Sequence, residues 1–215
     1  QAQLMENLAR LGGVEPGRVL EPLTGPVWGY RRRARLGVKH VARKGRVLVG
    51  FRERSAPFVA DLHECRVLAP PADRLIDPLA ALVGELSIAA RVPQVEVAVA
   101  GSDCALVLRV LDPPTAADLD RLRSFERAEG VRVYLQPGGP ATVAPLTPNL
   151  EPLRYELGHF GLAIEFEPID FIQVNATLNE AMVARALEIL ELEPASHVLD
   201  LFCGLGNFSL PLARS

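Results

Sequence analysis

His197-Val-Leu-Asp-Leu-Phe-Cys-Gly-Leu-Gly-Asn-Phe208 is the most informative segment of the 215-residue sequence. Its first five residues form a short apolar run, which is typical of a buried parallel strand. Gly204 and Gly206 follow in a tight turn, and a helix is predicted from Leu210. Strand, glycine turn and helix together predict the first half of a nucleotide-binding βαβ unit. The glycines permit positive φ angles and let the backbone approach a ligand closely.

This turn differs from a dinucleotide-binding turn because Ser209 stands where the third glycine of the GxGxxG pattern would be. Asp200 precedes the turn, and the pattern Asp-x-Phe-x-Gly-x-Gly-Asn-Phe resembles the first motif of class I S-adenosylmethionine (SAM) methyltransferases. SAM has no pyrophosphate, so a third glycine at the start of the helix is not required. The segment therefore favours a SAM site over a dinucleotide site.

The composition is that of a soluble globular protein, with 49% hydrophobic and 23% charged residues. No apolar run is long enough to span a membrane, so we expect no membrane partner. The sequence starts without Met and without the pattern of a signal peptide, which suggests that it begins inside a longer protein. The three cysteines (Cys65, Cys104 and Cys203) lie far apart, which indicates a reducing, cytoplasmic setting and no disulfide framework.

Positive charge is concentrated between Trp28 and Arg54, where ten Lys or Arg residues accompany one acid. The pattern from Tyr30 to Lys39 alternates, and it places apolar side chains on one face of a strand and Arg31, Arg33, Arg35 and Lys39 on the other. Exposed cations at this spacing can follow a phosphate backbone, and Trp28 and Tyr30 could stack on bases. The alternative is a solvated basic face with Trp28 in the core. The charge imbalance favours nucleic acid.

The remaining pattern predicts an α+β arrangement with a mixed or antiparallel sheet. We expect helices over 2–11, 72–91, 116–129 and 176–192, the last two capped by Thr115 and Asn175 and the last ended by Pro194. Hairpins are predicted over 30–51, 94–111 and 153–167, and a strand over 131–135. A boundary at the linker 168–170 divides the sequence into a central α+β domain (1–169) and the start of a Rossmann-like α/β domain (170–215).

With these elements placed, the chain resembles the RNA (uracil-5-)-methyltransferase family, and is most similar to its members that act on 23S ribosomal RNA. The resemblance is spread over nearly the whole chain. It rests on four segments: Trp28 to Leu36; Gly50-Phe-Arg52 with Cys65-x-x-Leu-Ala-Pro70; Asp170 to Asn175 with Met182 to Leu187; and Val198 to Phe208.

The resemblance implies specific site residues. Gln173, Phe202 and Asn207 match positions that contact SAM. Phe202 and Asn207 lie in the motif that also contains Asp200, Gly204 and Gly206, and Gln173 lies in the segment Asp170 to Asn175. Phe171 and Gln173 match positions near a uracil drawn out of its helix. These residue types suit the chemistry, because an amide can pair with a uracil edge and an aromatic ring can stack on a flipped base.

The family's reaction is covalent: a Cys thiolate adds to C6 of uracil, C5 takes the methyl group of SAM, and a carboxylate removes the C5 proton. In the family both groups lie beyond the segment that matches this chain, so we expect no catalytic residue within it, and we interpret Cys203 as structural. Family members also bind a [4Fe-4S] cluster through four cysteines, of which Cys65 matches the fourth. Three match no residue here, so the chain alone is not expected to build the cluster.

The resulting hypothesis is a piece of a monomeric enzyme that methylates C5 of a uridine in 23S ribosomal RNA, inactive by itself. Because a lone first strand lacks neighbours, we also expect the glycine turn to be less ordered than in a whole domain. Two alternatives remain open. One is a class I methyltransferase with another substrate, such as transfer RNA or a small molecule, the latter disfavoured by the basic hairpin. The other is a module that binds RNA without catalysis.

Overall fold

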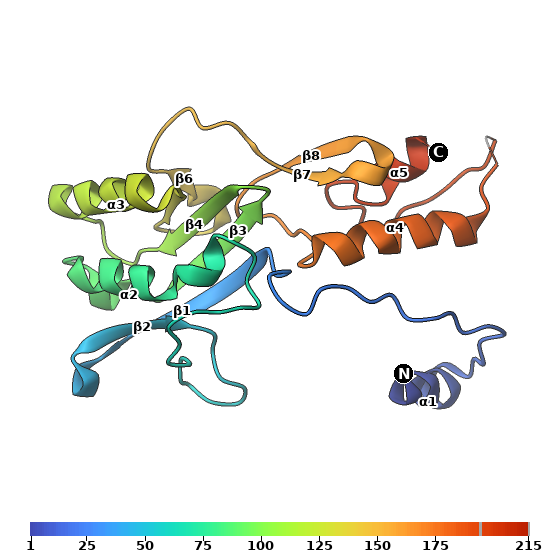
Figure 1. Ribbon diagram of the computed structural model, residues 1–215, viewed down its shortest axis with the longest axis horizontal. Coiled ribbons are helices and arrows are strands. Elements are labelled where there is room, and N and C mark those ends of the chain that lie inside the picture. The colour runs from blue at the N-terminus through green and yellow to red at the C-terminus, as the bar shows by residue number, and fades with distance from the viewer. Residues whose placement is uncertain (194, 215) are drawn as a thin grey trace.

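A six-stranded mixed sheet forms the centre of the computed structural model, which describes residues 1–193 and 195–214 (Figure 1). The strand order is β2-β1-β3-β4-β5-β6. Neighbouring strands are antiparallel except β4 and β5, which are parallel and joined through helix α3. This confirms the mixed sheet and the predicted hairpins. The strands are β1 (Arg33–Val41), β2 (Arg46–Gly50), β3 (Gln94–Ala100), β4 (Asp103–Arg109), β5 (Arg132–Gln136) and β6 (Ala144–Pro145).

Two apolar cores lie against the two faces of this sheet. The larger contains side chains from β1 to β5, from α2 (Ile76–Glu85) and from α3 (Ala116–Glu129). The smaller lies under the hairpin of β7 (Leu153–Leu157) and β8 (Leu162–Phe166), which packs on the alanines of β3 and β4. Small side chains at Ala98, Ala100 and Ala105 let the hairpin approach the sheet closely. The sheet is therefore covered by helices on one face and by a hairpin on the other.

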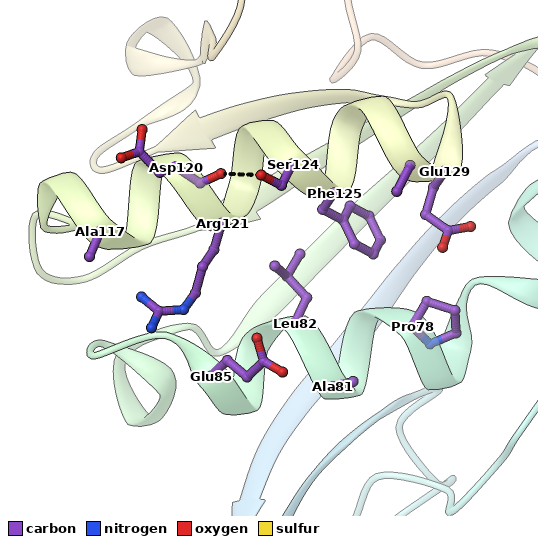
Figure 2. Close-up of a pocket in the computed structure, with 11 residues that line it drawn as sticks. Pro78, Ala81, Leu82, Glu85, Ala117, Asp120, Arg121, Ser124, Phe125 and Glu129 are labelled. Atoms are coloured by element: carbon purple, nitrogen blue, oxygen red, sulfur yellow. Dashed lines mark hydrogen bonds between the residues drawn. The ribbon is translucent and has the colours of Figure 1, made fainter.

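Helices α2 and α3 lie side by side over the sheet, with a groove between them (Figure 2). Leu82 and Phe125 face each other inside the groove, and Arg121 reaches toward α2. Helix α3 begins at the predicted cap, because the Thr115 side chain accepts from the backbone N–H of Asp118 and the Asp118 side chain accepts from that of Thr115. Gly130 ends it in the left-handed conformation, as expected for a C-terminal glycine.

The helix expected over 72–91 is wrong in extent, because α2 covers only Ile76–Glu85 between two short 3-10 turns. The backbone N–H of Ser87 would donate to Val83 in a continuing helix. It donates instead to Asp118 Oδ1 at 2.8 Å, and the Ser87 hydroxyl donates to Asp118 Oδ2 at 2.5 Å. A contact with α3, which local sequence does not specify, therefore ends α2.

The two ends of the chain lie outside the sheet layers (Figure 1). Helix α1 (Ala2–Gly12) confirms the expected N-terminal helix, but none of its residues is buried, and it stands apart at the end of an extended segment. Helix α4 (Ala176–Leu190) begins at Asn175, whose side chain accepts from Leu178 N–H at 3.0 Å. Pro194, expected to end this helix, lies outside the described residues. No helix in the described part of the chain is long and apolar enough to cross a bilayer.

The strand predicted over 197–201 is wrong: these residues are irregular, and Val198, Leu199 and Leu201 are exposed. A strand needs a neighbour to complete its hydrogen bonds, and nothing among the described residues pairs with this segment. The helix that follows is present as α5 (Ser209–Arg214). The division into domains at 168–170 stays a prediction.

Candidate functional site

Two segments that are about 140 residues apart in the sequence pair directly at the start of β1. Arg31 forms an antiparallel bridge with Asn175, and the Arg32 backbone N–H donates to the Val174 carbonyl at 2.9 Å. The Arg32 side chain adds a bond from Nε to the Gln173 carbonyl at 2.7 Å. The fold therefore brings the arginine-rich strand and the segment Phe171–Asn175, predicted separately as RNA-binding and as base- and SAM-contacting, into one place.

A groove of about 340 Å³ lies beside the paired segments, and four of the predicted RNA-binding residues line it. Its walls include Arg31, Arg33 and Arg35 from the strand and Phe171 from the pairing segment. The Phe171 ring is 79% exposed and the Arg35 side chain 68% exposed, so both are accessible to a ligand. We call this the arginine groove. An exposed aromatic ring beside cations suits a base and its phosphate.

Glu96 on β3 reduces the charge of the arginine groove. Its two carboxylate oxygens each lie 3.0 Å from an arginine, Oε2 from Arg33 and Oε1 from Arg35. Burial lowers the pKa of Arg33, and the charge of Glu96 opposes that effect. The prediction of exposed cations is therefore wrong for Arg33, whose side chain is only 15% exposed, and one shared carboxylate partly neutralises both arginines.

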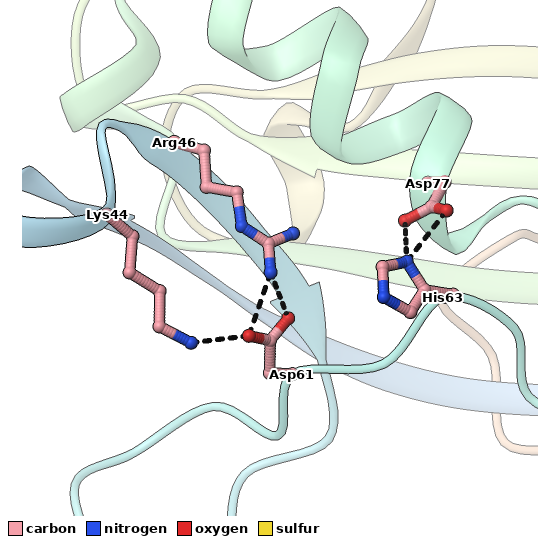
Figure 3. A network of polar contacts seen from close by, with 5 residues as sticks. All are labelled: Lys44, Arg46, Asp61, His63 and Asp77. Atoms are coloured by element: carbon pink, nitrogen blue, oxygen red, sulfur yellow. Dashed lines mark hydrogen bonds and ion pairs between the residues drawn. The ribbon is translucent and has the colours of Figure 1, made fainter.

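The other cations of the hairpin differ in how accessible they are. Lys39 is exposed on β1, as predicted. The Arg31 guanidinium lies over the Phe51 ring, 5.6 Å from its centroid. At the far end of the hairpin, Asp61 accepts hydrogen bonds from both Lys44 and Arg46 (Figure 3). Trp28 is 61% exposed, which excludes the alternative that it lies in the core.

Arg32 is a buried cation for which the sequence predicts no role. It is 6% exposed, and its guanidinium carbon lies 4.6 Å from the centroid of the Tyr155 ring. Burial lowers its pKa, although an arginine remains charged at neutral pH. The signal was present in the alternation itself, because Arg32 is in phase with Ala34 and Leu36 on the buried face.

The glycine turn has the backbone that its sequence predicted. Phe202, Gly204 and Gly206 all have positive φ, and a Cβ on Gly206 would lie 2.9 Å from Leu210 Cγ. Phe202 is fully exposed. The Ser209 hydroxyl donates to Asp200 Oδ2 at 2.5 Å. The serine that replaces a third glycine therefore ties Asp200 to the first residue of α5.

Asn207 joins the glycine turn to the rest of the fold. Its side-chain amide exchanges two hydrogen bonds with Asn179 of α4, both at 2.8 Å, and its Oδ1 also accepts from the Tyr155 hydroxyl at 3.2 Å. Asn179 is buried. The side chain expected to contact SAM is thus engaged by protein groups here, while its role toward SAM stays a prediction.

Replacing Asn207 with Ala is expected to loosen this turn, because both polar groups of the Asn179 amide lose their partners. A lost bond to a buried polar group costs about 1–2 kcal/mol, which is roughly fivefold to thirtyfold in the opening equilibrium. The opening equilibrium is measured by hydrogen exchange at the Gly206 N–H, which donates to the Cys203 carbonyl. Asn207→Asp keeps the acceptor and should lie between; exchange unchanged in both variants would contradict this role.

The described residues do not supply the ligands of an iron-sulfur cluster. No group of three or more His, Cys, Asp or Glu side chains within 1–193 and 195–214 is placed to hold a metal. Cys65 is half-buried, Cys104 is buried in β4, and Cys203 is exposed in the glycine turn. Burial raises the pKa of the Cys104 thiol to about 12. A [4Fe-4S] cluster normally takes four thiolates, so Cys65 as a ligand would need three from elsewhere.

Known proteins similar to this chain are named as uracil-5-methyltransferases. Residues 161–215 match the model of the tRNA (uracil-5-)-methyltransferase family. The chain is 55% identical over 215 residues to the 23S rRNA (uracil(1939)-C(5))-methyltransferase RlmD of Alkalilimnicola ehrlichii, covering 100% of this chain and 48% of that protein. It is 50% identical over 213 residues to the RlmD of Cupriavidus necator, covering 99% and 48%. The chain therefore spans about half the length of the curated relatives it matches.

A solved structure has the same fold. The chain aligns with the tRNA (uracil-54, C5)-methyltransferase of Pyrococcus abyssi, crystallised in complex with S-adenosyl-L-homocysteine, with a TM-score of 0.66 and 18% identity. The alignment covers 97% of this chain and 51% of that one. The mixed sheet with its helices thus belongs to a methyltransferase-like α/β fold, which bears out the coarser part of the predicted fold class.

Proposed function

Because the chain belongs to the RNA (uracil-5-)-methyltransferase family, we propose that the protein transfers a methyl group from SAM to C5 of a uridine in 23S ribosomal RNA. The observation that carries the proposal is the pairing of Arg31–Arg32 with Val174–Asn175. This pairing holds Phe171 beside Arg33 and Arg35 in the arginine groove. An exposed ring can stack on a uracil while the cations hold the adjoining phosphates.

The glycine turn supports a role for SAM. Phe202, Gly204 and Gly206 have positive φ, the Phe202 side chain is fully exposed, and Gln173 carries an amide in the segment that precedes α4. When bound, SAM would supply the methyl group. Residues Gln173, Phe202, Asn207, Asp200, Gly204 and Gly206 would hold it, with 170–215 as the start of a class I methyltransferase domain. Asn207 would need to exchange its bond with Asn179 for one with the ligand.

We assign no catalytic residue within the chain. A nucleophile for C6 of uracil must be a thiolate. Cys104 is buried with a raised pKa, Cys203 lies within the turn proposed for SAM, and Cys65 matches the fourth ligand of the cluster. Transfer RNA is the second candidate substrate, since the matching family model and the Pyrococcus relative are named for it. The 55% identical relative is named for 23S rRNA, which favours ribosomal RNA.

The expected result for this chain is RNA binding without methyl transfer. Binding of a 23S rRNA fragment should weaken steeply as salt increases, because bound phosphates release counterions. No label should pass from tritiated SAM to the RNA. Filter binding at several KCl concentrations and counting of the recovered RNA measure the two quantities. Salt-independent binding would contradict the phosphate contacts, and incorporated label would contradict the absence of a nucleophile.

A further inference from the structure

A second pocket, of about 620 Å³, lies at the N-terminal end of α4. It shares no lining residue with the arginine groove. Four other segments meet there: the residues that lead into β1, Ala69–Pro70, the turn between β3 and β4, and strand β7. The polar or helix-end residues that line it include Arg32, Ser102, Arg154, Tyr155, Ala176 and Thr177.

Arg32 is the buried cation of this pocket. It is more than nine-tenths buried, and it lines the pocket. Its Nε is used by the Gln173 carbonyl, but its Nη2 is buried and has no hydrogen-bond partner. None of the ion pairs formed by the described residues includes it. A buried guanidinium with an unsatisfied nitrogen is costly unless an anion accompanies it.

The N-terminus of α4 adds a second positive element. The helix has 15 residues, so its backbone dipoles give this end a partial positive charge. Asn175 caps the N–H of Leu178. The N–H of Ala176 faces the Tyr30 carbonyl within the Arg31–Asn175 bridge, whereas the N–H of Thr177 occupies the second position of the helix, where there is no internal acceptor. Both residues line the pocket and are exposed. Helix ends of this kind bind phosphate.

We propose that this pocket binds one phosphate group of the RNA chain, an inference that rests on the proposed function. Arg32 and the Thr177 N–H at the positive end of α4 supply the charge, and Ser102 and Thr177 supply hydroxyl donors. Two acids stand nearby: Glu156 lines the pocket, and Glu165 pairs with Arg154 at 2.7 Å. Both are exposed, so solvent and salt screen them far more than the buried Arg32. Binding here would hold the RNA beside the segment that bears Phe171.

Ala176→Asp tests the pocket without removing a structural contact. An aspartate at the first position of a helix interacts favourably with the positive end of the helix dipole, so the fold should remain intact. The same charge should repel a phosphate. RNA affinity of the 215-residue chain should fall about four- to tenfold, and the salt slope should decrease by about 0.7, the value for one phosphate of a single strand. Ala116→Asp makes the identical change at the first position of α3, away from the pocket, and should leave both quantities unchanged.

Inorganic phosphate provides the independent measurement, by titration into isotopically labelled chain. Backbone amide signals of Ala176 and Thr177 should shift in wild type and not in Ala176→Asp. If phosphate shifts these signals but RNA does not bind, the pocket stands and the proposed RNA function fails. If RNA binds and Ala176→Asp behaves like Ala116→Asp, the pocket proposal fails and the proposed function stands. Unshifted amide signals would also overturn the pocket.

Discussion

Replacing Phe171 with Ala is expected to weaken binding of a uridine-rich single-stranded RNA by about tenfold or more. Stacking of a base on an aromatic side chain contributes about 1–3 kcal/mol. The ring is 79% exposed, so its removal should leave the fold unchanged. Fluorescence anisotropy with labelled oligonucleotide at fixed salt measures the dissociation constant. Phe171→Tyr keeps the planar ring and should retain most of the affinity.

Two controls separate stacking from a general loss of apolar surface. Phe58 is also exposed, at 62%, but does not line the arginine groove, so Phe58→Ala should bind RNA like wild type. An oligonucleotide of 5,6-dihydrouridine has no aromatic ring to stack, so wild type and Phe171→Ala should bind it alike. An equal loss of affinity for both oligonucleotides would exclude stacking as the role of Phe171.

Asp118→Ala should lower the free energy of unfolding by about 3 kcal/mol. Asp118 is fully buried between α2 and α3. It accepts from the N–H and hydroxyl of Ser87 and from the N–H and hydroxyl of Thr115. Hydrogen bonds to a charged group contribute about 1.5–3 kcal/mol, and a buried donor left unpaired adds its own cost. Urea unfolding followed by circular dichroism measures the change.

The same substitution should alter the response to acid. Burial alone would raise the pKa of Asp118, but the hydrogen bonds from Ser87 and Thr115 outweigh it and lower the pKa below its ordinary value. A lowered folded-state pKa gives stability that is present above the unfolded-state pKa, about 3.9, and is lost as pH falls toward the folded-state value. The difference between wild type and Asp118→Ala should therefore shrink below about pH 4. Asp120→Ala, which removes an exposed ion pair with Arg123, should cost about 0.5 kcal/mol or less at any pH.

Much of the fold could be predicted because it depends on neighbours in the sequence. Thr115 and Asn175 cap their helices through side chains that reach residues three positions on. Gly130 ends α3 because glycine tolerates positive φ. The alternation around Ala34 and Leu36 gave the buried face of β1, and it also placed Arg32 there. In the candidate site, the conformation of the glycine turn and the accessibility of Lys39 follow from the same local rules.

Other features could not be predicted, because their partners are distant in the sequence. Glu96 neutralises Arg33 and Arg35 only because β1 and β3 are adjacent in the sheet, with Arg35 opposite Glu96. Asp118 ends α2 from a neighbouring helix. The run at Val198 to Leu201 was expected as a strand from its apolar character, which gives a preference but no hydrogen-bonding partner.

By itself, the sequence determined the helix caps, the hairpins and the buried face of β1, since these depend on side-chain chemistry and short-range geometry, whereas the residues proposed for SAM follow from the family resemblance. Only the tertiary structure decided which segments act together. It joined Arg31–Arg32 to Val174–Asn175, placed Phe171 in the arginine groove, and left Arg32 buried at the end of α4. The physical reason is that charge pairing and burial depend on distance in space, and strand pairing sets that distance across about 140 residues of chain.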